Sequence, residues 1–379
     1  MILLSPGGRA SSSSAQASAE MIVGTVDGIE CLSRAGTTWQ TTSRGLEGVF
    51  VSSLTSLESG RLVAGLHGFG VAVSDDRGRN WTLSNRGLEQ LDVWVVNAHR
   101  INGREVLFAG TLPAHLFRSD DGGATWTEVG SLLTAPSASQ WSFPPAPHVA
   151  HVLDVAALRD VIWVGVEVGA LLRSDDCGET FQELAVNDDV SEVDIHRIIL
   201  NEAQPDRVLV ATGWGMIVSD DRGKTWRTGG SLPGIDYPVP FVGHPDDADL
   251  LFVAGGRSWP PNWYELGRSR ARIARSRDGG ATWEHLLGGL PEGQRATYGA
   301  LALHAWPHGF DVFAADTDGQ IFESRDGGDS WQVVAETAPV SKGDQFRGLA
   351  KNAKPNLGVH DLVFTGAGLD RVQGSYAPH

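Results

Sequence analysis

Basic residues are scarce in this chain of 379 residues. Lysine and arginine together number 30, against 46 aspartate and glutamate residues, which gives a formal net charge of −16. A protein that neutralises nucleic-acid phosphates needs a basic surface, and an anionic membrane attracts basic segments. The charge balance therefore predicts that neither nucleic acid nor a membrane is a partner. It favours a small-molecule ligand, and it suits cationic or metal ligands.

Cysteines and long apolar runs are also few. The two cysteines, Cys31 and Cys177, show no metal-ligand spacing, and nothing indicates a disulfide between them. No run of 18 or more apolar residues is present to form a transmembrane helix. The apolar stretch after Met1 is too short for a signal-peptide core. We therefore expect a cytoplasmic protein in which residues 1–20 form a flexible N-terminal tail.

Glycine and tryptophan, by contrast, are abundant, with 47 and 13 copies, and they recur in one short pattern. The pattern Ser-x-Asp-x-Gly-x-Thr-Trp occupies residues 119–126, and close variants lie at 74–81, 174–181, 219–226, 276–283 and 324–331. A seventh copy at 33–39 lacks the Asp. The closing aromatic residues are 42 to 57 residues apart, which is typical of one four-stranded propeller blade. The repeat predicts an all-β, seven-bladed β-propeller over residues 21–366, followed by a C-terminal tail at 367–379.

Each residue type in the pattern, which we call the box, has a structural role. The Asp carboxylate can accept bonds from nearby backbone N–H groups, Gly permits the turn, and Trp can pack between neighbouring sheets. The box aspartates are therefore expected to be structural rather than catalytic. Residues 21–27 resemble the second strand of a blade that lacks an inner strand, and residues 358–364 look like an inner strand without a blade. We expect this C-terminal strand to complete the first blade and close the ring, because closure removes free sheet edges.

The six well-matched boxes resemble those of the Asp-box, or BNR, repeat proteins, and the likeness covers about residues 21–366. Proteins of this kind include sialidases, xyloglucanase-type glycoside hydrolases, sortilin-like receptors and a photosystem assembly factor. The resemblance implies a fold but no particular chemistry, since these proteins differ in function. Sialidases carry an Arg-Ile-Pro motif and a Tyr–Glu nucleophile pair. This chain has no Arg-Ile-Pro and only four tyrosines, which argues against sialidase activity.

Long insertions mark one face of the predicted propeller. The two longest intervals between boxes place extra residues in loops at the face where the inner strands begin, which we call the top face. Loops of this length are usually functional when they are ordered. Aromatic residues in or near the top-face loops could form a substrate-binding pocket, or could simply pack at the rim or in a subunit contact. They are Trp94, Trp141, Trp214, Trp259, Trp263, Tyr264 and Tyr298.

Several of the twelve histidines map to the same face. Imidazoles combined with one or two carboxylates can bind Zn, Fe, Ni, Cu or Mn, and an incomplete set of protein ligands leaves room for water or substrate. Glu167 or Asp154 would then be a further ligand or the general base. A packed, hydrogen-bonded histidine is the alternative at every position. The candidate metal ligands are His67, His115, His151, His196 and His360.

Three functions remain open. The first is a metal-dependent hydrolase, lyase or oxidase that acts on a small molecule. The second is a glycoside hydrolase or lyase with paired carboxylates, and the third is a propeller that binds a protein or ligand without catalysis. The convergence of histidines, aromatic residues and long loops on one face favours the first. The carboxylates available to the second are Asp154, Glu167, Asp194, Asp236 and Asp361.

Overall fold

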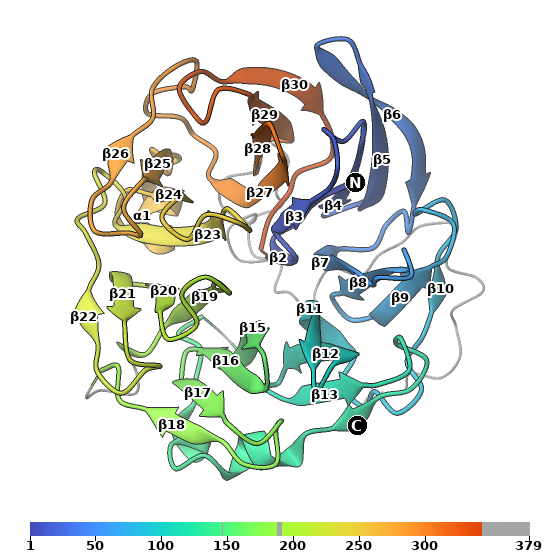
Figure 1. Cartoon of the computed structure of the whole chain (residues 1–379), viewed down its shortest axis with the longest axis vertical. Helices are drawn as coiled ribbons and strands as arrows, with labels where there is room; N and C mark the ends of the chain where they lie inside the picture. Colours follow the sequence, from blue (N-terminus) through green and yellow to red (C-terminus); the bar gives the residue numbers. More distant parts are fainter. Residues whose placement is uncertain (146, 188–191, 343–379) are drawn as a thin grey trace.

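Seven small sheets surround a central axis and form an all-β, seven-bladed propeller, as the repeat predicts (Figure 1). The computed structural model describes residues 1–145, 147–187 and 192–342. Strands that follow one another within a blade pair antiparallel, in the order of the chain from the channel to the rim, and short parallel strands from the N-terminus add to three of the blades. No helix in these ranges is long and apolar enough to cross a membrane.

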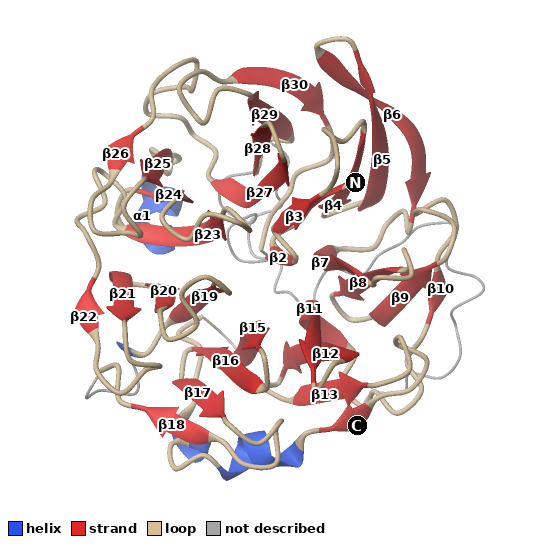
Figure 2. Ribbon diagram, in the orientation of Figure 1, coloured by secondary structure: helices blue, strands red, loops and turns tan. Residues whose placement is uncertain are grey.

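The blades differ mainly in strand length. Blades 1 to 4 consist of β4 (Glu20–Thr25), β5 (Gly28–Ala35) and β6 (Thr38–Gly45); β7 (Val51–Ser56), β8 (Leu62–Leu66), β9 (Gly70–Ser74) and β10 (Thr82–Leu83); β11 (Asp92–Ile101), β12 (Arg104–Leu112), β13 (Leu116–Ser119) and β14 (Thr127–Glu128); and β15 (His151–Leu158), β16 (Val161–Glu167), β17 (Ala170–Ser174) and β18 (Gln182–Leu184). Blades 5 to 7 consist of β19 (Ile195–Leu200), β20 (Val208–Thr212), β21 (Gly215–Ser219) and β22 (Arg227–Thr228); β23 (Tyr237–Gly243), β24 (Leu251–Gly256), β25 (Arg272–Ser276) and β26 (Glu284–His285); and β27 (Tyr298–Trp306), β28 (Gly309–Asp316), β29 (Gln320–Ser324) and β30 (Gln332–Glu336). The helix α1 (Pro260–Leu266) and two short 3-10 segments, Gly130–Thr134 and Ala138–Gln140, lie in connections between strands (Figure 2).

The box turns are held by the hydrogen bonds that the sequence predicts. In blade 3, the Ser119 hydroxyl donates to Asp121 Oδ1 (2.8 Å) and accepts the Gly123 N–H (2.9 Å). Asp121 also accepts the backbone N–H of Thr125 at 2.9 Å and its hydroxyl at 2.6 Å. These bonds, those from Thr125 foremost, lower the pKa of Asp121 to about 2. The structural role expected for the box aspartates is confirmed here, and the same bonding recurs in the other well-matched boxes.

The tryptophan that ends a box packs between two blades. Trp126 belongs to the core between blades 2 and 3, together with Val63, Val71 and Phe117. Its indole N–H donates to the carbonyl oxygen of Ser84 at 2.9 Å. The box therefore both folds its own turn and fastens one blade to the preceding one.

Arginine side chains connect four of the blades with the next one. Arg118, which directly precedes the box serine of blade 3, donates to the carbonyl oxygen of Cys177 in the box of blade 4 at 3.2 Å. That carbonyl belongs to the residue just before the box glycine. Other blades repeat the contact with the corresponding carbonyl of the following box. These pairs are Arg61 with Gly122, Arg173 with Arg222, and Arg275 with Gly327.

The N-terminal residues form strands, and the expected flexible tail at 1–20 is wrong for residues 2–13. The strand β1 (Ile2–Leu4) pairs in parallel with β4, β2 (Gly7–Gly8) with β7, and β3 (Ser11–Ser13) with β27. The segment thus runs along the channel edges of blades 1, 2 and 7 and joins the last blade to the first (Figure 1). The side chains of β1 are buried between blades, which explains the order.

The strand β1 fills the inner edge of blade 1. The sequence analysis assigned that place to residues 358–364. Those residues, and the expected tail at 367–379, lie outside the described residues.

Candidate functional site

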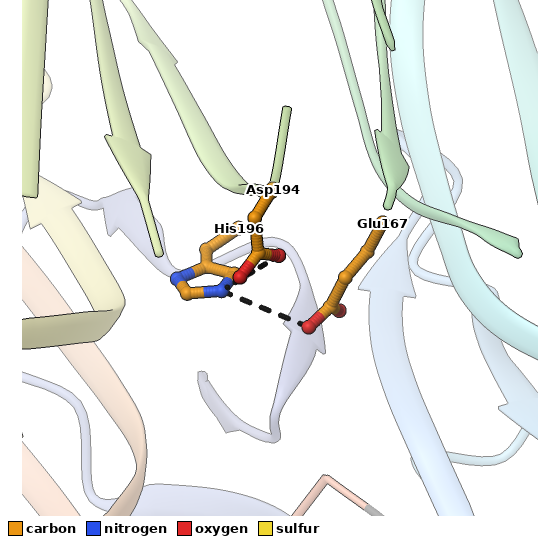
Figure 3. A group of neighbouring side chains, drawn as sticks. All are labelled: Glu167, Asp194 and His196. Carbon is orange, nitrogen blue, oxygen red and sulfur yellow. Dashed lines mark ion pairs between the residues drawn. The ribbon is translucent and has the colours of Figure 1, made fainter. Parts of the chain in front are cut away.

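Three ionisable side chains from blades 4 and 5 meet at the top of the channel (Figure 3). Glu167 ends β16, Asp194 lies just before β19, and His196 is the second residue of β19. His196 Nε2 lies 3.2 Å from Asp194 Oδ1 and 3.7 Å from Glu167 Oε1. One potential ligand atom from each residue lies within 4.8 Å of the other two. The side chains are 1%, 7% and 18% exposed for His196, Glu167 and Asp194, so the cluster is largely shielded from water.

The orientation of the His196 ring is fixed from the neighbouring blade. Its Nδ1 lies 2.6 Å from the carbonyl oxygen of Pro238 in β23. Because a carbonyl oxygen can only accept, Nδ1 must carry a proton and donate it. Nε2 therefore faces Glu167 and Asp194 either as a lone pair or as a second N–H. Metal-binding histidines are commonly oriented by such a bond from the other ring nitrogen.

A second histidine approaches Glu167 from blade 4. His151 begins β15, is fully buried, and its Nε2 lies 3.2 Å from Glu167 Oε2. The ring of Trp94 packs on His151 at 3.7 Å between centroids, and His67 contacts the same indole at 4.6 Å. His67 Nδ1 in turn lies 2.8 Å from Asp92 Oδ1. The polar cluster thus continues from blade 5 to blade 2 along the top of the channel.

A repeated β-bulge explains which side chains reach this site. The pairing register of the inner strands shifts at Trp94 in β11, at Leu153 in β15 and at His196 in β19. A bulge places an extra residue in one strand and redirects its side chain. Matching bulge positions in three neighbouring blades therefore carry Trp94, Leu153 and His196.

The same register places Asp154 away from the cluster. Asp154 and His196 both stand near the start of an inner strand in the sequence, which would give them the same place in blades 4 and 5, but the bulges align Asp154 with Arg197. Asp154 Oδ2 accepts the backbone N–H of Ile198 at 2.8 Å, and its Oδ1 lies 3.3 Å from Arg197 Nη1. Asp154 therefore connects blades 4 and 5 and is not brought to the cluster around Glu167.

Charge interactions set the protonation of the His196–Asp194 pair. Burial disfavours the charged forms of both groups, but the charge and hydrogen bond of Asp194 outweigh it and raise the pKa of His196. Glu167 raises the pKa of His196 further, whereas the charge of the buried Lys342 opposes the rise. Burial is likewise outweighed at Asp194, where the charge and hydrogen bond of His196 lower the pKa of the carboxyl. Without a metal the two groups therefore form an imidazolium–carboxylate pair, so a cation that binds there must replace a proton.

Of the other predicted metal ligands, His115 is not brought to the cluster. It lies before β13, its Nδ1 is 2.6 Å from Glu128 Oε1 on the outer strand β14, and its ring stacks on Phe117. His360 lies outside the described residues. His151 and His196 both contact Glu167, and His67 lies beyond Trp94.

The predicted aromatic residues divide into three groups. Trp94 lies within the site, and Trp141 packs on Gly169, two residues after Glu167. Trp263 and Tyr298 are 0% and 1% exposed, so they serve as core rather than as a substrate surface. The third group is exposed to solvent: Trp214 is 39% exposed, Trp259 54% and Tyr264 36%.

The list of predicted site residues omitted two side chains that contact His196. Asp194 appeared only among the carboxylates of the second hypothesis, although it lies two residues before His196. Tyr237 starts β23, its ring centroid is 4.5 Å from that of His196, and its hydroxyl donates to Asp194 Oδ2 at 3.4 Å. Its position at the start of an inner strand was the signal that could have identified it.

Comparison with known proteins supports the fold. No family model matches the chain. A xyloglucanase of a Paenibacillus species is 28% identical over 145 residues, which cover 33% of this chain and only 13% of the xyloglucanase. An ancestral GH74 enzyme is 14% identical with a TM-score of 0.56, over 76% of this chain and 39% of that chain.

Two smaller proteins match over most of their length. YCF48 from Cyanidioschyzon merolae is 13% identical with a TM-score of 0.53, over 78% of this chain and 89% of that one. Virginiamycin B lyase from Staphylococcus aureus is 13% identical with a TM-score of 0.52, over 78% and 85% of the two chains. At such identities the likeness extends to the fold and not to the chemistry. The chain is therefore a seven-bladed β-propeller that shares its architecture with a hydrolase, a lyase and YCF48.

Proposed function

We propose that this protein is a metal-dependent enzyme that acts on a small molecule at the top of the channel. Glu167, Asp194 and His196 would hold a divalent transition metal. The observation that carries the proposal is the bond from His196 Nδ1 to Pro238, which turns Nε2 toward two buried carboxylates. The recurring box turns also support placing the chain among the Asp-box repeat propellers.

The spacing of the three side chains suits a small divalent ion. Ligand atoms about 2.1 Å from a tetrahedral zinc ion are roughly 3.4 Å apart. The distances of 3.2 Å and 3.7 Å from His196 Nε2 to its two carboxylate partners bracket that value. One imidazole with two carboxylates suits Zn, Mn or Fe better than a soft, thiolate-seeking ion.

Three protein ligands would leave room for water or substrate. A metal in such an open site supplies a Lewis acid and lowers the pKa of bound water. The chain's own residues supply the orientation, since Pro238 holds His196 and His151 contacts the second oxygen of Glu167. Buried Tyr237 contacts both His196 and Asp194 and would help to hold these two ligands in place. Hydrolysis or elimination fits this set of groups.

The test is the metal content of purified, untagged protein after incubation with Zn²⁺ or Mn²⁺ at pH 8 and desalting. We expect near-stoichiometric metal in the unmodified protein and in His115→Ala, whose histidine lies outside the cluster. His196→Ala and Glu167→Gln should each lose it. Equal metal in His196→Ala and His115→Ala, or none in the unmodified protein, would refute the proposal.

One observation favours a second candidate, a glycoside hydrolase or lyase that needs no metal. The raised pKa of His196 keeps a proton beside two carboxylates, and general acid–base catalysis needs such a proton. The GH74 enzyme and the lyase have the same fold. Turnover of aryl glycosides or of an elimination substrate by protein treated with EDTA would favour this candidate.

A further inference from the structure

A cavity of about 430 Å³ lies at the bottom end of the channel, away from His196. The far halves of the inner strands of blades 3 to 6 form one wall, from which Val155, Ile199 and Val242 contribute apolar surface. Residues 8–11 of the N-terminal segment form the opposite wall. This volume is in the range of small-molecule sites, which are mostly apolar with a few placed polar groups.

The cavity wall carries one positive charge without a close partner. Arg197 is neutralised by Asp154 at 3.3 Å and also donates to the carbonyl oxygen of Gly8. Arg9 also lines the cavity, and in the described part of the chain its guanidinium makes no hydrogen bond or ion pair. Burial lowers the pKa of Arg9, and the charges of Glu105 and Glu58 oppose this without reversing it.

The two histidines in the wall add no charge at neutral pH. Burial lowers the pKa of His99 to about 4, and both of its ring nitrogens already contact backbone groups of blade 4. Burial likewise lowers the pKa of His244. Arg207 and Glu202 also line the cavity and carry opposite charges, so Arg9 leaves the cavity wall with a net positive charge in a protein whose overall charge is −16.

The backbone around Arg9 is fixed on both sides. The Arg9 N–H donates to Leu54 in blade 2 at 2.9 Å, and Leu303 in blade 7 donates to Ala10 at 2.8 Å. Gly8 has φ of +80°, and a Cβ there would lie 2.1 Å from the Leu54 oxygen, so only glycine fits. Arg9 is thus presented to the cavity by a backbone that is already held in place, so a ligand would have to order only its side chain.

We propose that this cavity binds a small organic carboxylate with an apolar body, through Arg9. A guanidinium can hold a carboxylate through two parallel hydrogen bonds, and a monoanion balances the single uncompensated charge. A dianion such as phosphate would leave excess negative charge beside Asp154 and the apolar wall. The site is separate from the proposed metal cluster and does not depend on it.

The proposal can be tested by saturation-transfer NMR with acetate, isobutyrate, benzoate and phenylacetate, each beside its neutral amide. At least one carboxylate should bind more strongly than its amide. Arg9→Gln should weaken that carboxylate about tenfold or more, because it removes the charged half of a hydrogen-bonded pair. Arg104→Gln, an equal charge change at an exposed position on the same face, should not, and neither should His196→Ala.

A second measurement needs no variant and so does not depend on Arg9→Gln folding normally. Phenylglyoxal modifies accessible arginines, and the bound carboxylate should slow its reaction at Arg9 but not at Arg104, as read by peptide mass spectrometry. Binding of carboxylates and amides alike, unchanged affinity in a folded Arg9→Gln, or no protection of Arg9 would each overturn the proposal. Binding of no carboxylate in the panel would overturn it as well.

Discussion

Arg34 Nη2 in the first blade lies 2.7 Å from Glu323 Oε1 in the last blade, so an ion pair joins the two ends of the ring. The same nitrogen lies 3.1 Å from Asp311 Oδ2, and both carboxylates are buried. Burial and the charge of Glu323 raise the pKa of Asp311 to about 6 despite the guanidinium. Glu323 occupies the position before the box serine where other blades have an arginine. The contact between blades 7 and 1 therefore has a carboxylate at this position in blade 7 and takes its arginine from blade 1.

Removal of Arg34 should weaken the contact between blades 7 and 1. We expect Arg34→Gln to lower the free energy of unfolding by about 2 to 3 kcal/mol, because buried Asp311 loses its cation and Glu323 keeps only Arg325, at 3.1 Å. Urea denaturation measures the change. Arg44→Gln is the matched control, since Arg44 pairs with Glu30 while its own side chain is 59% exposed. Adding Glu323→Gln to Arg34→Gln should recover part of the loss, and an equal effect of both arginine variants would contradict the prediction.

The N-terminal strand should contribute to stability as a core element. Leu4 is 0% exposed and packs between blades 1 and 7 with Met21 and Phe313. We expect Leu4→Ala to cost about 2 to 4 kcal/mol, the usual range for a buried leucine. Leu83→Ala, at a leucine that is 37% exposed, should cost far less. A flexible N-terminus would instead make both substitutions nearly neutral, and thermal unfolding distinguishes the two cases.

The His196–Asp194 pair should make the metal-free protein pH-dependent. The pKa of His196 is raised in the folded state, so its contribution is fully present below the unfolded value and is lost as pH rises through the folded value. In EDTA, the free energy of unfolding should therefore fall between neutral and alkaline pH relative to His196→Gln. Parallel curves for the two proteins would show that the pair is not charged. Affinity for a metal should instead rise with pH, since metal binding displaces the proton from His196.

The repeat allowed most of the architecture to be predicted from sequence. Ser119, Asp121 and Gly123 interact over four residues, so their spacing alone specifies the turn. The N-terminal strands were missed for the opposite reason. Each of β1, β2 and β3 has only two or three residues, and each gains its order from a different, distant blade. No local period can indicate such pairing.

The site was predicted in part, and the bulges explain the limit. Histidine positions at inner-strand starts led to His151 and His196, and a carboxylate at a strand end led to Glu167. The alignment of Asp154 with His196 was displaced by one residue, because a bulge adds a residue that alternation in the sequence does not reveal. His115 shares the turn position of His67 but pairs with the outer strand of its own blade. Which of two similar histidines reaches the channel depends on tertiary contacts.

The arginine contacts between successive boxes end on backbone carbonyl oxygens, as Arg118 does at Cys177. Every amino acid supplies that oxygen, and the acceptor positions accordingly hold Gly122, Cys177, Arg222 and Gly327. A change of residue at an acceptor therefore needs no compensating change in the neighbouring blade. Gene segments that encode single blades can on this account be duplicated or exchanged without co-evolution at these four contacts, whereas ion pairs between blades, such as Arg34 with Glu323 and Arg197 with Asp154, must be inherited together.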